Sequence, residues 1–200
     1  MKRTGLKLMV GLSFCFCLLW CELAAQDSDW ANLKRYRQAN RELSVPEKGE
    51  KRVVFMGNSI TEGWGEKHPE FFNENNCVER GISGQTSYQF LVHFRKDIIN
   101  LYSKLVVINA DTNDAPENIG PFDADITFGN IVSMVEFTEA NKIKVILTSV
   151  LPASKFGWNP RIADAAECIT TLNRKIEAYA KDKGILYVNY YKKMVSGLEC

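Results

Sequence analysis

Five short and almost continuous apolar runs are spread along the chain from residue 52 onward. They have the length of strands, and they lack the apolar/polar alternation of a sheet with one solvated face. Such runs are expected when both faces of a parallel sheet are covered. We therefore expect strands at 52–56, 77–80, 105–110, 144–149 and 186–189.

Between these runs, apolar residues recur at intervals of three and four, the spacing of one helix face. Three such faces are formed by Phe90, Leu91, Phe94, Ile98 and Leu101, by Phe128, Ile131, Val132 and Val135, and by Ile169, Leu172, Ile176 and Tyr179. Gly184 stands where the third helix should end. The alternation of strands and helices predicts one α/β domain with a doubly wound parallel sheet.

The first 50 residues do not follow this pattern. Residues 1–25 combine a basic start, an apolar stretch and small residues before Gln26, which is typical of a secretory signal peptide. The apolar stretch is short for a membrane span. We expect an exported protein, periplasmic or extracellular, without stable membrane insertion after cleavage; an uncleaved anchor and a lipoprotein anchor at Cys21 are the alternatives. Residues 26–50 predict an N-terminal helical extension that packs loosely on the domain at 51–200.

Charge and cysteine content exclude several classes of function. Removing residues 1–25 takes away three bases and one acid, which leaves a net charge of −1 instead of +1. Such a chain is not expected to bind nucleic acid. Cys77, Cys168 and Cys200 are widely spaced and belong to no Cys-x-x-Cys or Cys/His cluster, so neither a metal site nor a cofactor is expected. A single disulfide among them is left open.

A serine stands at the break between the first apolar run and the helix-like segment after it. Gly57, Asn58 and Ser59 form a turn that lifts the hydroxyl clear of the backbone, beside amide N–H groups without intrahelical partners. A nucleophile and an oxyanion site need this geometry. Gly-Asn-Ser is also ordinary turn chemistry. The Gly-x-Ser-x-Gly elbow of α/β-hydrolases is absent, because Thr61 stands in place of its second glycine.

Three further loops follow strands at the same edge of the predicted sheet. Segment 81–86 follows the second strand, 112–114 follows the third, and 151–160, which contains Phe156 and Trp158, follows the fourth. Each loop has a plain structural explanation as a turn or a core cap. Ligands of open parallel sheets bind beyond the carboxyl ends of the strands, however, so the gathering of these loops favours a site there.

These segments resemble the sequence blocks of the SGNH (GDSL-type) esterases and acylhydrolases. Segment 55–61 resembles the first block, with Asn58 in place of the usual aspartate, segment 80–86 resembles the second, and Asn113-Asp114 the third. The likeness extends over roughly residues 50–195 in the same order and spacing. It implies a three-layer α/β/α sandwich with a flavodoxin-like parallel sheet of about five strands.

The resemblance also implies site residues. Ser59 would be the nucleophile, and the backbone N–H groups of Ser59 and Gly84 together with the side-chain amide of Asn113 would be the oxyanion donors. These roles are physically sensible, because acyl transfer needs donors aimed at the developing negative oxygen.

Two departures from the family pattern stand out. Asp111 occupies a glycine position of the third block, where it would add negative charge near the oxyanion. The family's fourth block, Asp-x-x-His, supplies the general base, and no such block occurs in these 200 residues. We therefore expect a domain that is incomplete at its C-terminus, exposes an apolar sheet face and has impaired turnover. His68 and His93 are interpreted as surface residues with little prospect of replacing the base.

Three functions follow from this interpretation. The leading one is a secreted serine ester hydrolase acting on acylated small molecules or acetylated carbohydrate, with Trp64, Phe156 and Trp158 able to stack on a sugar ring. The second is a catalytically silent remnant that binds carbohydrate or ester. The third, a phosphate or flavin cradle at 57–61, has no supporting Walker or Gly-x-Gly-x-x-Gly spacing. The sequence makes no prediction of the oligomeric state.

Overall fold

The central element of the protein is a five-stranded parallel sheet. In the computed structural model, which describes residues 29–109 and 112–196, the strand order is β2-β1-β3-β4-β5. The strands are β1 (Val53–Gly57), β2 (Cys77–Gly81), β3 (Leu105–Ile108), β4 (Lys144–Thr148) and β5 (Leu186–Val188). The expected signal peptide, Asp111 and Cys200 lie outside the described residues.

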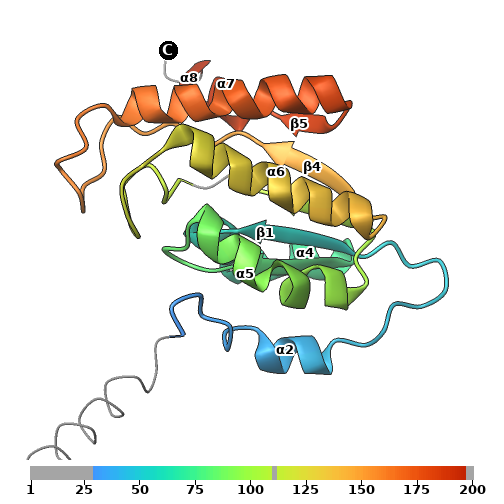
Figure 1. Ribbon diagram of the computed structural model, residues 1–200. Helices are drawn as coiled ribbons and strands as arrows, with labels where there is room; N and C mark the ends of the chain where they lie inside the picture. Colours follow the sequence, from blue (N-terminus) through green and yellow to red (C-terminus); the bar gives the residue numbers. More distant parts are fainter. Residues whose placement is uncertain (1–28, 110–111, 197–200) are drawn as a thin grey trace, which may run out of the picture.

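Helices cover the two faces of this sheet and make three layers (Figure 1). One face carries α5 (Ser87–Asp97), the short η1 (Ile99–Leu101), α6 (Ala124–Ala140) and α7 (Ala165–Lys183), with α6 in contact with both α5 and α7. The other face carries α3 (Ser59–Lys67) and α4 (Pro69–Glu74), with α8 (Tyr190–Ser196) following β5. The expected doubly wound α/β sandwich is confirmed.

The main core lies between the sheet and α5–α7. Alternate residues of the central strands, among them Val54, Met56, Val106 and Ile108, are fully buried there. Their neighbours Phe55 and Val107 point to the opposite face, where packing is less complete. The observed strand bounds agree with the expected runs to within two residues, because apolar runs covered on both sides leave little ambiguity.

Gly184 ends α7 as the sequence predicted. It adopts a left-handed conformation (φ +65°) and donates through its backbone N–H to the Lys181 carbonyl, which is the usual way of ending a helix with glycine. The chain can then turn directly into β5.

The N-terminal segment, here residues 29–44, contains the short helix α2 (Arg37–Glu42) and lies along the β2–α5 edge (Figure 1). It is not loosely packed. Tyr36 is 5% exposed, and its hydroxyl lies 2.9 Å from Glu79 Oε2. Asn40 donates through Nδ2 to Asp97 Oδ1 (2.6 Å). This attachment is polar, so the helical spacing of apolar residues did not reveal it.

None of the helices in the described part of the chain combines the length and the apolar character that a membrane span needs.

Candidate active site

Ser59 is the first residue of α3, immediately after β1. Asn58 caps this helix: its buried side chain accepts a hydrogen bond from the backbone N–H of Ile60 (2.9 Å). Capping oxygens of this kind fix the start of a helix. Ser59 itself is exposed, and within the described residues its hydroxyl forms no side-chain hydrogen bond. It is therefore presented to solvent at the positive end of a helix.

Gly57 allows the tight turn before Ser59. A Cβ atom at this position would lie 2.1 Å from Thr61 Oγ1 and 3.1 Å from Asn109 Cβ. Thr61 cannot easily move away, because its hydroxyl accepts a hydrogen bond from Asn109 Nδ2 (3.0 Å). Asn109 in turn accepts through Oδ1 from the Thr148 hydroxyl (2.9 Å), so this polar chain joins α3 to the ends of β3 and β4.

The loop after β2 lies directly against the start of α3. Ile82 N–H donates to the Gly57 carbonyl (3.0 Å), and a Cβ at Gly81 would lie 2.7 Å from the Asn58 carbonyl oxygen. Gly84 in this loop is exposed and left-handed (φ +77°), a conformation that favours glycine. The β1 and β2 loops therefore form one continuous surface.

Asn113 connects the loop after β3 to the loop after β2. It is 6% exposed, and its Nδ2 donates to the Gln85 carbonyl (2.9 Å). The next residue, Asp114, is also buried and accepts from both the backbone N–H and the hydroxyl of Ser87 (2.8 and 2.6 Å). Burial raises the pKa of the Asp114 carboxyl, against these hydrogen bonds, which lower it. Asp114 thus fastens the β3 loop to the start of α5.

The two histidines occupy very different positions. His68 is exposed, contacts Glu70 (3.1 Å) and follows the end of α3, about 13 Å along the helix axis from Ser59. His93 is fully buried, which corrects its interpretation as a surface residue. Its Nε2 contacts Gln85 Oε1 (2.6 Å), and its Nδ1 lies 3.1 Å from Asp97 Oδ2. Neither histidine is hydrogen-bonded to Ser59.

The three expected sugar-binding aromatic residues also differ. Phe156 is 1% exposed and belongs to the core, so it presents no face for stacking, and the expectation for this residue is wrong. Trp64 is half-buried and stacks on Phe71, with 4.7 Å between the ring centroids. Trp158 is 65% exposed and lies on the surface as expected. Of these three residues, the half-buried Trp64 and the exposed Trp158 have surface that could touch a ligand.

Trp158 is linked to the Gly84 loop through a residue that the sequence did not single out. Its Nε1–H donates to Asn118 Oδ1 (3.1 Å), and Asn118 Nδ2 donates to the Gly84 carbonyl (3.2 Å). The loops after β2, β3 and β4 therefore meet at the same edge of the sheet. A single exposed asparagine gives no pattern in the sequence from which this link could be predicted.

A cavity of about 230 Å³ lies between α3, α8 and the sheet. Its walls are mainly apolar and include Phe55, Ile60, Trp64, Leu151 and Met194. Ile60 adjoins Ser59 in the chain, so the cavity opens beside the serine turn. Met194 of α8, which lines the cavity, is 48% exposed.

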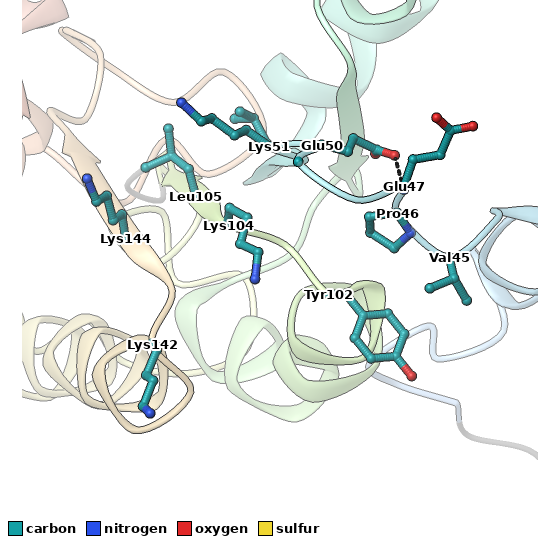
Figure 2. A pocket seen from close by; sticks show the side chains of 12 residues that line it. Val45, Pro46, Glu47, Glu50, Lys51, Tyr102, Lys104, Leu105, Lys142 and Lys144 are labelled. Atoms are coloured by element: carbon teal, nitrogen blue, oxygen red, sulfur yellow. Dashed lines mark hydrogen bonds between the residues drawn. The ribbon is translucent and has the colours of Figure 1, made fainter.

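A larger cavity, about 790 Å³, lies at the opposite, amino-terminal edge of the sheet (Figure 2). Lys51, Lys104, Lys142 and Lys144 line it, and their amino groups end at separate places around it instead of converging on one point. Lys104 and Lys142 follow the ends of η1 and α6, where the helix dipole favours cations. This cavity is separate from the Ser59 turn.

Two observations on the described residues bear on metal and disulfide chemistry. They contain no group of three or more His, Cys, Asp or Glu side chains that could hold a metal ion. Cys77 and Cys168 are free thiols, and burial raises the pKa of each.

Two solved structures resemble this chain over most of its length, and a third shares its fold. A candidate acylhydrolase from Bacteroides fragilis is 62% identical, with a TM-score of 0.83 over 84% of this chain and 81% of its own. A GDSL-like lipase from Bacteroides thetaiotaomicron is 61% identical, with a TM-score of 0.81 over 83% of this chain and 81% of its own. An acetylxylan esterase from Geobacillus stearothermophilus shares the fold at 17% identity, with a TM-score of 0.60 over 78% and 83% of the two chains.

A search of curated protein sequences finds no match. The family model of the GDSL-like lipases and acylhydrolases matches residues 55–199, which begin at the strand before Ser59 and include all the loops described above. The chain therefore belongs to the GDSL-like lipase/acylhydrolase family.

Proposed function

We propose that the protein is a serine ester hydrolase with Ser59 as its nucleophile. The backbone N–H groups of Ser59 and Gly84 and the side-chain amide of Asn113 would bind the oxyanion. The observation that carries this proposal is the exposed Ser59 hydroxyl at the start of α3, in a turn hydrogen-bonded to the Gly84 loop, to which Asn113 is in turn bonded. Family membership supports the same assignment.

In the proposed reaction, Ser59 Oγ attacks the acyl carbon of the ester, and the carbonyl oxygen takes up the negative charge. Donors already oriented toward that oxygen stabilise the transition state without reorganising. The alcohol then leaves, and water hydrolyses the acyl-serine. Replacing Asn113 by Ala should lower turnover about 10²- to 10³-fold, the usual cost of losing one oxyanion donor.

The substrate class proposed is an acylated small molecule or an acetylated carbohydrate. Trp158 supports this choice, because its exposed indole is joined through Asn118 to the Gly84 loop and could stack on a sugar ring near the reacting ester. Trp64, beside the apolar cavity, is the second candidate contact.

The proton of the Ser59 hydroxyl needs an acceptor. Neither His68 nor His93 is placed to take it, and these 200 residues contain no Asp-x-x-His sequence. A serine hydroxyl without a neighbouring base is a weak nucleophile at neutral pH, so we propose slow turnover for this chain. The same observation favours the second candidate function, a protein that binds ester or carbohydrate without hydrolysing it.

Two measurements separate these functions. A chromogenic short-chain acetate should be hydrolysed by the parent protein and not by Ser59→Ala, whereas equal turnover by both would exclude the serine mechanism. A fluorophosphonate should label Ser59 of a slow hydrolase. Carbohydrate binding by calorimetry, with neither turnover nor labelling, would establish the silent binding protein instead.

We also propose that the protein is exported after removal of residues 1–25. N-terminal sequencing of the protein secreted by an expressing cell should then begin at Gln26. Retention of residue 1 in that sequence would exclude cleavage.

A further inference from the structure

The loop that carries Gly84 is held by several segments of the chain. Gly84 itself offers little restraint, since it is exposed and no atom lies within 4 Å of where its Cβ would be. Its neighbour Ser83 donates through its backbone N–H to Glu62 Oε2 (2.8 Å), and Glu62 pairs with Arg35 (2.9 Å). The conformation of the glycine must therefore be imposed by the residues around it.

Gln85 is the most strongly held residue of this loop. It is 2% exposed, and its Nε2 donates to the Ala31 carbonyl (2.6 Å), while its Oε1 accepts from His93 Nε2 (2.6 Å). Its backbone carbonyl accepts from Asn113 Nδ2. Gln85 is thus bonded directly to one proposed oxyanion donor and follows the other in the chain.

The partners of Gln85 are themselves buried and fixed. His93 is bracketed by Gln85 and by Asp97, and both His93 and Asp97 are fully buried. Asp97 accepts from Asn40 Nδ2 (2.6 Å), and Asn40 accepts from Arg80 Nε (2.8 Å). The hydrogen bonds of Gln85, Asn40 and Arg80 favour one arrangement of this network, because breaking one of them leaves a buried donor or acceptor unpaired.

Two of the residues in this network, Ala31 and Asn40, belong to the N-terminal segment. A third contact strengthens the link, because Gln89 on the first turn of α5 donates to the Trp30 carbonyl. The segment therefore reaches the loop that bears Gly84 through backbone carbonyls, although it lies outside the residues matched by the family model, which begin at 55.

We propose that Gln85 is a positioning residue of the active site: it holds the Gly84 N–H and the Asn113 amide in place by anchoring their loop to the N-terminal segment and to the His93–Asp97 pair. This inference rests on the oxyanion roles proposed above. If Gln85 has this role, residues 29–44 contribute to the structure of the active site.

The test replaces Gln85 by Leu, which has a similar size but cannot form either side-chain hydrogen bond. Gln85→Glu is the second variant, since it keeps an acceptor for His93 but replaces the donor to Ala31 by a carboxylate oxygen that faces the Ala31 carbonyl. Leu172→Ala and Ile176→Val, in the core of α7, are matched controls that lower stability without touching the loop. All four are compared with the parent at a temperature where each is fully folded.

Two readouts are needed. The first is the NMR signals of the Gly84 backbone amide and the Asn113 side-chain amide. The second is the rate at which a fluorophosphonate labels Ser59. In Gln85→Leu we expect both signals to shift and labelling to slow at least tenfold, and in Gln85→Glu we expect both signals to shift as well. Both controls should keep the parent signals and rate.

Parent-like signals in Gln85→Leu, with only a lower melting temperature, would overturn the positioning role. If the parent itself is not labelled, the proposed nucleophile fails, and the NMR comparison still decides whether Gln85 positions the loop. The two proposals therefore fail in distinguishable ways.

Discussion

At the scale of single residues, the turn before Ser59 is shaped by a missing side chain. Gly57 lies so close to Thr61 that a methyl group has no room, and the Asn109 hydrogen bond prevents Thr61 from giving way. Glycine is required here because Thr61 leaves no space for a side chain. A left-handed backbone is not the reason, since the φ angle of Gly57 is not positive.

Replacing Gly57 by Ala should therefore destabilise the protein by about 1–3 kcal/mol, the usual cost of overpacking. Gly63→Ala, in the helix α3 that follows Gly57, is the control, because nothing outside its own helix and neighbours lies within 4 Å of its Cβ position, and alanine there should stabilise by up to about 1 kcal/mol. Urea denaturation measures both. If Gly57→Ala is as stable as the parent, the close approach of Gly57 to Thr61 does not exclude a methyl group.

Asp97 gives a prediction about pH. Burial raises the pKa of its carboxyl, but hydrogen bonds from His93, Lys96 and Asn40 outweigh this and hold the pKa below the ordinary 3.8. A depressed pKa in the folded state contributes stability that is present above pH 3.8 and is lost as pH falls through the folded value. The free energy of unfolding should therefore decrease below about pH 4.

In Asp97→Asn, the free energy of unfolding should depend less on pH below pH 4. At neutral pH it should be lower than in the parent by roughly 3 kcal/mol, as expected when one partner of a buried charged network is removed. Asp125→Asn is the control, since that carboxylate is 82% exposed and pairs with Lys175 at the surface. Unfolding free energies measured in urea from pH 2.5 to 7 provide the comparison. If Asp97→Asn loses stability below pH 4 as steeply as the parent does, the depressed pKa of Asp97 is not the cause of that loss.

At the scale of elements, the sequence predicted the strands and main helices well, because their evidence is local. A run of apolar residues or a glycine at the end of a helix can be recognised without knowing its neighbours. The buried polar residues could not be recognised in this way. His93, Gln85 and Asp97 resemble surface residues in the sequence, but all three are buried, and residues 29–44 supply hydrogen-bond partners to Gln85 and Asp97. The prediction for Phe156 was wrong for the opposite reason: an aromatic residue in a loop can be part of the core, and the sequence alone does not distinguish it from an exposed one.

Replacing glycine by alanine should lower stability at the end of a helix and raise it in the middle of a helix. Gly184→Ala places a side chain at φ +65° and should destabilise by about 1 kcal/mol. Gly129→Ala, inside α6 with open space around its Cβ position, should stabilise by about 0.5–1 kcal/mol. The melting temperature should fall in Gly184→Ala and rise in Gly129→Ala. Equal changes in the two melting temperatures would contradict the left-handed conformation of Gly184 at the end of α7.

At the scale of the whole molecule, the sheet brings distant segments of the chain to one edge. Loops after β1, β2, β3 and β4 carry Ser59, Gly84, Asn113 and Trp158, and hydrogen bonds join the loops pairwise. The N-terminal segment closes this arrangement from outside the family domain. The central claim is that the three proposed catalytic groups converge on one point in this frame.

A crystal structure of the protein after reaction with a phosphonate tests this claim most directly, because the phosphonyl oxygen imitates the oxyanion. We expect the adduct on Ser59 Oγ, with that oxygen about 3 Å from both the Gly84 backbone nitrogen and Asn113 Nδ2. An adduct on another residue, or a phosphonyl oxygen turned away from Gly84 and Asn113, would contradict the account.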